Sequence, residues 1–183
     1  MHPSSGRTVG AIVEEERLKG IFRSVDVNGD GEISSGELQR ALGNGSFQYP
    51  FRLDVVERMI SMFDRDFTGT INAREFVALW QYVSDWEKVF RRYDTKSDGY
   101  IDRAQFGTCL YAMGYRLSPY AVDSVVKRHG RPDSRGLHFD DFLACCVTVF
   151  TLTDIFRVHD TRQNGYASFN YDDFISKLSR AKY

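Results

Sequence analysis

The chain has 183 residues, and its 24 Lys and Arg against 25 Asp and Glu give a formal net charge of −1. A nearly neutral chain lacks the basic surface that binds a nucleic-acid backbone, so we expect no nucleic-acid partner. Apolar residues at 42% and charged residues at 27% exclude a disordered tail protein and are typical of a globular protein with its own core.

The first expected structural unit surrounds a twelve-residue acidic motif. We expect residues 1–17 to be a flexible N-terminal segment and residues 18–183 to form the folded domain. Apolar residues at helical spacing precede and follow the motif DVNGDGEISSGE, which occupies Asp26–Glu37. This motif matches the loop of an EF-hand, the helix–loop–helix unit that binds calcium.

The residues of this first loop suit the chemistry of calcium. The ion takes six to eight oxygen ligands, and a tight loop closed by a distant carboxylate wraps them around it. The sequence supplies oxygens from side chains at loop positions 1, 3, 5 and 12 and from the backbone carbonyl at position 7. These predicted ligands are Asp26, Asn28, Asp30, Glu37 and, at position 7, Glu32.

A second loop, DRDFTGTINARE, begins at Asp64. Thr68 stands at position 5, where the first loop has a carboxylate, and a hydroxyl or a water molecule fills that place. Because fewer formal charges surround the ion, we expect this loop to bind calcium more weakly than the first. Its predicted ligands are Asp64, Asp66, Thr68, Thr70 and Glu75, and Asn72 offers a further oxygen.

Three further copies of the loop are degraded, and they begin at Asp94, Gly130 and Asp160. In the third loop Lys96 stands at position 3 and Gln105 at position 12. An ammonium repels a cation, so we expect this loop to be empty at micromolar calcium. We expect Lys96 to bridge instead to a loop carboxylate, Asp94 or Asp102. The fourth and fifth loops are predicted to be structural because poor ligands stand at their ligand positions, namely Gly130, Pro132, Ser134, Arg162 and Tyr171.

The spacing of the five loops predicts two long helices that neighbouring hands share. Too few residues separate the second loop from the third, and the fourth from the fifth, for two helices and a linker. Glu75–Tyr93 and Asp141–His159 are therefore each predicted to be one helix, and both lack proline. The prediction is an all-α fold of five EF-hands, with short β-bridges between paired loops.

This arrangement of five hands resembles the penta-EF-hand family. The resemblance covers residues 18–183, and it is carried by SMFDRDFTGTINAREF, LWQYVSDWEKVFRRYD, MGYRLSP and FDDF…LTDIFR. These phrases look most like the group that contains programmed cell death protein 6 and peflin. In that group the first and third hands are the principal calcium sites, whereas here the ligand residues favour the first and second.

The resemblance implies a dimer formed through the odd fifth hand. In the family this hand pairs with its counterpart on a second protomer, either a second copy or another penta-EF-hand protein. The last segment of the chain is too apolar to be left exposed, and the expected interface residues are Phe169, Phe174 and Ile175. The alternative is that this segment folds back onto the third and fourth hands.

The resemblance also implies a peptide-binding groove. The counterparts of five residues line a groove that takes Pro/Tyr-rich segments when calcium shifts an arginine-bearing loop. These residues are Trp80, Tyr82, Trp86, Met113 and Arg116. The alternative is that these aromatic residues only fill the core.

We therefore expect a calcium sensor and adaptor with two calcium ions, for which Mg²⁺ competes, and with Pro-rich partners in membrane trafficking. No phosphate-binding loop, nucleophile elbow or HExxH motif is present, so we expect no enzyme. The alternatives are the regulatory small subunit of a calpain-type protease and a calcium buffer. The expected location is the cytoplasm, extending to the nucleus or to endoplasmic-reticulum exit and endosomal membranes through peripheral, calcium-dependent association.

Overall fold

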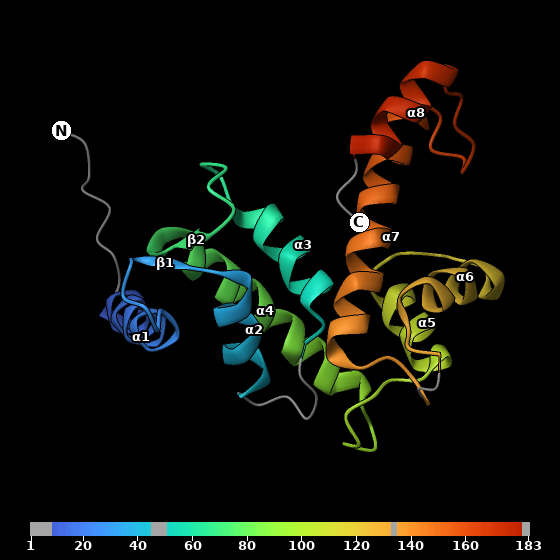
Figure 1. Cartoon of the computed structure of the whole chain (residues 1–183). Coiled ribbons are helices and arrows are strands. Elements are labelled where there is room, and N and C mark those ends of the chain that lie inside the picture. The colour runs from blue at the N-terminus through green and yellow to red at the C-terminus, as the bar shows by residue number, and fades with distance from the viewer. Residues whose placement is uncertain (1–8, 45–50, 133–134, 181–183) are drawn as a thin grey trace. The chain divides into compact units, whose positions relative to one another are not determined.

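The computed structural model describes residues 9–44, 51–132 and 135–180 of the chain (Figure 1). The chain divides into two compact units, Met1–Asp85 and Trp86–Tyr183, where the sequence predicted one domain, and each unit is described by itself. Helices and one two-stranded sheet make up the regular structure of these ranges. This confirms the predicted all-α fold with short β-bridges.

Unit 1 contains the first two hands. The capping residue Ser34 accepts a hydrogen bond from the N–H of Glu37, and the Glu37 side chain accepts one from the N–H of Ser34. This capping box starts the helix after the first loop and fixes the last residue of that loop in its first turn. The elements of the unit are α1 (Val9–Val25), β1 (Glu32–Ile33), α2 (Ser35–Gly43), α3 (Leu53–Phe63), β2 (Ile71–Asn72) and most of α4 (Ala73–Tyr93).

The start of α1 differs from the sequence prediction. The helix begins at Val9, inside the segment of residues 1–17 that the sequence was expected to leave flexible. This stretch, VGAIVEEER, contains no proline and is rich in good helix formers, so it extends the helix that the first hand needs. Residues 1–8 lie outside the described ranges.

The two strands of unit 1 hold its two loops side by side. β1 pairs antiparallel with β2, with Glu32 opposite Asn72 and Ile33 opposite Ile71. Both isoleucines are fully buried, and α2 packs against α3 on the same unit. The apolar position 8 of each loop therefore lies in the core.

Unit 2 contains the remaining hands. An isolated antiparallel bridge joins Ile101 of the third loop to Leu137 of the fourth. The buried ring of Phe142 lies near the centre of the unit, with its centroid 5.5 Å from that of Phe90 and 6.0 Å from that of Phe106. The elements after α4 are α5 (Arg103–Ala112), α6 (Pro119–His129), α7 (Phe139–His159) and α8 (Tyr171–Arg180).

The helices α4 and α7 confirm the two predicted shared helices. By length and composition alone α7 is also long and apolar enough to cross a membrane, which is weak evidence. Its first half is buried and α6 packs against it, as expected for the central helix of a folded unit. Three free, buried cysteines lie in this unit, and burial raises the pKa of Cys109 to about 11. A thiol with such a pKa is suited to packing rather than to redox chemistry.

Candidate metal centres

Four of the five loops share one turn. In each, the carboxylate at position 1 accepts a hydrogen bond from the N–H of the glycine at position 6, which has a positive φ. The N···O distances are 3.0 Å for Gly31 to Asp26, and 2.9 Å for Gly69 to Asp64, Gly99 to Asp94 and Gly165 to Asp160. Loops with good and with poor ligand residues both have this turn, so it does not identify a binding loop.

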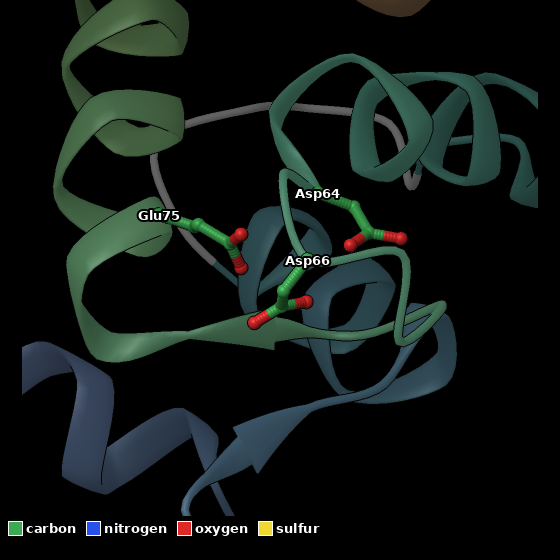
Figure 2. A group of neighbouring side chains, drawn as sticks. All are labelled: Asp64, Asp66 and Glu75. Carbon is green, nitrogen blue, oxygen red and sulfur yellow. The ribbon is translucent and has the colours of Figure 1, made fainter.

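The second loop brings three carboxylates together. Asp64 follows α3, Asp66 lies in the loop, and Glu75 lies in the first turn of α4 (Figure 2). Oxygens of the three side chains all lie within 4.8 Å of one another. Three converging anions on a short loop suit a hard, oxygen-seeking cation, so these residues fit calcium.

Backbone N–H groups orient the closing carboxylate of this loop. Oε1 of Glu75 accepts from the N–H of Arg65 at 2.7 Å, and Oε2 accepts from the N–H of Asn72 at 3.1 Å. The Asn72 amide also donates to Asp66 at 3.1 Å. The hydrogen bond from the Thr68 side chain is the main reason why the pKa of Asp66 lies below its ordinary value. Asp66 is thus held as the anion that a cation requires.

Thr68 and Thr70, which were predicted as ligands of the second loop, contact each other. The Thr68 hydroxyl lies 3.0 Å from the Thr70 hydroxyl, which donates to the carboxylate of Glu32 at 2.9 Å. Sequence reasoning used only the backbone carbonyl of Glu32 and missed its side chain. No signal in the motif would have found it, because position 7 of an EF-hand loop is selected for its carbonyl.

The first loop offers oxygens only. Oε1 of the buried Glu37 accepts from the N–H of Val27 at 3.0 Å, and Oε2 accepts from the N–H and the hydroxyl of Ser34 at 3.0 and 2.6 Å. The Asn28 amide donates to Asp30 at 2.7 Å. Within the described residues, the acidic side chains of this loop do not converge as closely as those of the second loop. The donor set still fits calcium, and the predicted order of affinities stays a prediction.

The calcium-free protein should lose stability in acid partly through Glu37. Hydrogen bonds from the Ser34 hydroxyl, from the Ser34 N–H and then from the Val27 N–H lower the pKa of Glu37 from 4.5 to about 2. The unfolded chain therefore binds this proton more tightly, so Glu37 stabilises the fold above pH 4.5 and the contribution is lost as the pH falls towards 2. Chemical denaturation in chelator should show a weaker pH dependence over this window for Glu37→Gln. The exposed Glu57→Gln is the control, and equal slopes for both variants would contradict this role of Glu37.

The third loop is closed without a carboxylate at position 12. Oε1 of Gln105 accepts from the N–H of Asp102 at 2.7 Å, and Nε2 donates to the Thr95 hydroxyl at 3.0 Å. The described contacts include no ion pair of Lys96 with Asp94 or Asp102, so the expected bridge is not formed. The reason is that the loop's own N–H groups already satisfy both carboxylates.

Gln105→Glu alone should not give the third loop a calcium ion at micromolar concentrations. Lys96 would still stand at a ligand position, where two unit positive charges about 4 Å apart repel by about 4 kcal/mol at an effective dielectric near 20, and the double charge of calcium doubles this repulsion. Calorimetry should therefore count the same number of ions as in the wild type. The variant that combines Lys96→Asn with Gln105→Glu should bind one more. An extra ion with Gln105→Glu alone would show that the charge argument is wrong.

An arginine closes the fourth loop. Nη2 of Arg131, at position 2, donates to both carboxylate oxygens of Asp140 at 3.0 and 2.8 Å, and its Nε lies 4.0 Å from Asp141. A guanidinium thus neutralises the carboxylates at positions 11 and 12 of this loop. Ser134 lies outside the described residues. In the fifth loop the side chains of Arg162 and Tyr171 are exposed and offer no carboxylate.

The structure places the groove residues in different units. Trp80 contacts Phe76 and Tyr82 contacts Phe63 in unit 1. Trp86, Met113 and Arg116 lie in unit 2, where Trp86 contacts Phe142 and Phe150 and the exposed Arg116 lies over the ring of Tyr111. The groove would combine residues of both units, so it stays a prediction.

Comparisons with known proteins agree with the loops. A family model described as an EF-hand domain pair matches residues 15–81, and one described as an EF-hand domain matches residues 85–114. The chain is 42% identical to human sorcin, covering 88% of this chain and 81% of sorcin. It is 39% identical to human grancalcin, with 80% and 68% covered, and 35% identical to peflin of Xenopus laevis, with 85% and 55% covered.

A solved structure of a homologue of programmed cell death 6 protein from Leishmania major Friedlin also matches. It has a TM-score of 0.79 and 29% identity, with 88% of each chain covered. Peflin and this homologue represent the group that the sequence phrases indicated. These relatives cover between 80% and 88% of this chain. The chain therefore belongs to the penta-EF-hand family of calcium-binding proteins.

Proposed function

We propose that the protein is a non-enzymatic calcium sensor and adaptor. It binds calcium in its first and second hands, dimerises through its fifth hand, and takes up Pro/Tyr-rich segments of membrane-trafficking proteins when calcium is bound. It acts in the cytoplasm and associates with membranes peripherally. Calcium binding is supported by the converging carboxylates of the second loop, and the dimer by the fifth loop, which pairs with no other loop within the described residues.

The fifth hand differs from the others in its pairing. The first two loops pair through β1 and β2, and the third and fourth through the bridge of Ile101 with Leu137. Within the described residues the fifth loop forms no such bridge. An EF-hand without a partner leaves the end of its loop and one helix face uncovered, so a second hand of the same kind would fit there.

The side chains of this hand support the same view. Phe169 packs inside the hand, 4.3 Å from the ring of His159 and 5.5 Å from that of Phe174. Ile175 is 44% exposed and Phe174 39% exposed, and Tyr171 is exposed beside them. Folding back onto the third and fourth hands would bury these apolar groups, so their exposure favours a dimer.

Light scattering coupled to gel filtration tests the dimer. The wild type should have the mass of a dimer, and Ile175→Glu should have the mass of a monomer because a charge would be buried in the interface. Tyr120→Glu, at an exposed aromatic outside the fifth hand, should remain dimeric. A monomeric wild type would contradict the homodimer. Co-purification with a cysteine-protease chain would favour the calpain-type subunit instead.

Tryptophan fluorescence tests the calcium-dependent adaptor. Trp80 and Trp86 both lie on α4, which follows the second loop. The fluorescence should change with calcium between about 10⁻⁷ and 10⁻⁵ M, the range of sensor EF-hands, and a Pro/Tyr-rich synthetic peptide should bind only then. Calcium binding by calorimetry with unchanged fluorescence and no peptide binding would instead indicate a calcium buffer.

A further inference from the structure

Three side chains connect the first loop to the second. The carboxylate of Glu32, in the first loop, accepts a hydrogen bond from the Thr70 hydroxyl at 2.9 Å. The Thr70 oxygen lies 3.0 Å from the hydroxyl of Thr68. Thr68 occupies position 5 of the second loop, where a calcium loop usually has a carboxylate or amide. This row of three hydrogen-bonded side chains therefore begins at a negative charge in the first loop and ends at a ligand position in the second loop.

The number of protons fixes the direction of these hydrogen bonds. A threonine hydroxyl has one proton and two lone pairs, and an ionised carboxylate only accepts. The Thr70 proton is used on Glu32, so Thr68 is the donor in the contact between the two hydroxyls. With its proton directed to Thr70, the oxygen of Thr68 accepts one long hydrogen bond from the N–H of Thr70, at 3.4 Å, and keeps its other lone pair for a cation.

Two acceptors lie near the Thr68 hydroxyl, the Thr70 oxygen at 3.0 Å and the carboxylate of Asp66. A cation at the loop would take Asp66 as a ligand and leave Thr70 as the acceptor. Thr70 is a good acceptor only while its own hydroxyl proton is donated to Glu32, because hydrogen bonds in a chain strengthen one another.

The strand pairing fixes the geometry of this row. Glu32 lies in β1 directly opposite Asn72 of β2, and its side chain is half-buried. Thr70 immediately precedes β2, so the same pairing brings it to Glu32. The contact is therefore built into the scaffold that joins the two loops rather than made by two mobile surface side chains.

We infer that Glu32 is a positioning residue for the second calcium site, acting through Thr70 on the oxygen of Thr68. Its carboxylate supplies, through two hydroxyls, part of the negative charge that position 5 of the second loop lacks. The inference rests on the proposed binding of calcium by the second loop. It also couples the two sites, because calcium at the first loop binds the backbone carbonyl of Glu32 and holds the residue in place.

Calorimetric titration with calcium in a Glu37→Ala background tests the effect on the second calcium site, because only the second loop then binds calcium. Glu32→Gln and Thr70→Val should each weaken binding about 5-fold, the worth of one hydrogen bond. The variant with both changes should bind about as well as either single variant, since both interrupt one row. The exposed Glu57→Gln removes the same charge outside the loops and should bind like the background.

Thr68→Asp provides a rescue. A carboxylate at position 5 no longer needs Glu32, so Glu32→Gln should not weaken binding in the Thr68→Asp protein. If Glu32→Gln instead weakens calcium binding equally in the protein with Thr70 and in the Thr70→Val variant, Glu32 acts only as a general negative charge. The inference is then overturned. An unchanged affinity in the Glu32→Gln and Thr70→Val variants would overturn it as well.

A second measurement needs no calcium. Chemical denaturation in chelator of the wild type, Glu32→Gln, Thr70→Val and the variant with both changes forms a double-mutant cycle. The two changes should be coupled, with a combined effect smaller than the sum of the single effects. Additive effects would overturn the contact itself. If the cycle shows coupling but the second loop binds no calcium, the proposed calcium site fails while the contact stands.

Discussion

Glu37→Ala is expected to remove the tighter of two calcium-binding events. The buried carboxylate of Glu37 is the closing ligand of the first loop, and it is held towards that loop by the N–H of Val27 and by Ser34. Calcium would take both of its oxygens, so alanine removes two charge-assisted contacts. We expect a loss of at least about 100-fold in affinity at this site, which corresponds to roughly 3 kcal/mol. Isothermal calorimetry would show one event instead of two.

The matched variant is Glu75→Ala in the second loop. It should remove the weaker event and leave the tighter one, because the two glutamates have the same position and the same kind of backbone donors. The structure adds a reason to test which loop binds calcium more tightly, since the carboxylates lie closer together in the second loop than in the first. Removal of the tighter event by Glu75→Ala would reverse the assignment. An unchanged titration with Glu37→Ala would refute the first site altogether.

The sequence was sufficient for most of the fold because the loop motif is local. A twelve-residue pattern flanked by apolar residues at helical spacing specifies a helix on each side of it. The helix predicted over Glu75–Tyr93 is observed as Ala73–Tyr93, and the helix predicted over Asp141–His159 as Phe139–His159. The start of α1 was missed because no loop or cap marks it.

The candidate sites were only partly predictable, since some contacts depend on how loops pair. The side chain of Glu32 reaches Thr70 through the register of β1 and β2, and the motif carries no information about that register. Arg131, at position 2 of the fourth loop, donates to Asp140 at position 11, and the motif does not predict this contact either. Both residues stand at loop positions where the motif demands no particular side chain, so pattern matching assigns them no role.

The arginine of the fourth loop restricts where calcium can act. Arg131 provides a permanent positive charge where a binding loop would receive a cation, next to two buried carboxylates. The response to calcium should then originate in unit 1, at the pair of loops with oxygen ligands.

Arg131→Met should destabilise the protein by about 3 kcal/mol, the low end of the cost of removing one partner from a buried ion pair. Asp140 is 2% exposed and Asp141 is fully buried, so the substitution removes a positive charge that pairs with buried carboxylates in unit 2. Urea denaturation should show the loss equally with and without calcium. Arg103→Met is the control, because the exposed Arg103 pairs with Asp123 at the surface and such pairs contribute at most about 1 kcal/mol.

Asp140→Asn in the Arg131→Met protein separates charge from packing. The amide keeps the shape of the carboxylate but carries no charge, so it should recover part of the lost stability. If the double variant is no more stable than Arg131→Met alone, the packed aliphatic part of Arg131, rather than its charge, holds the loop. A loss for Arg131→Met no larger than that for Arg103→Met would show that the fourth loop does not depend on its arginine. In that case the restriction of the calcium response to unit 1 would have to rest on the ligand residues of the loops alone.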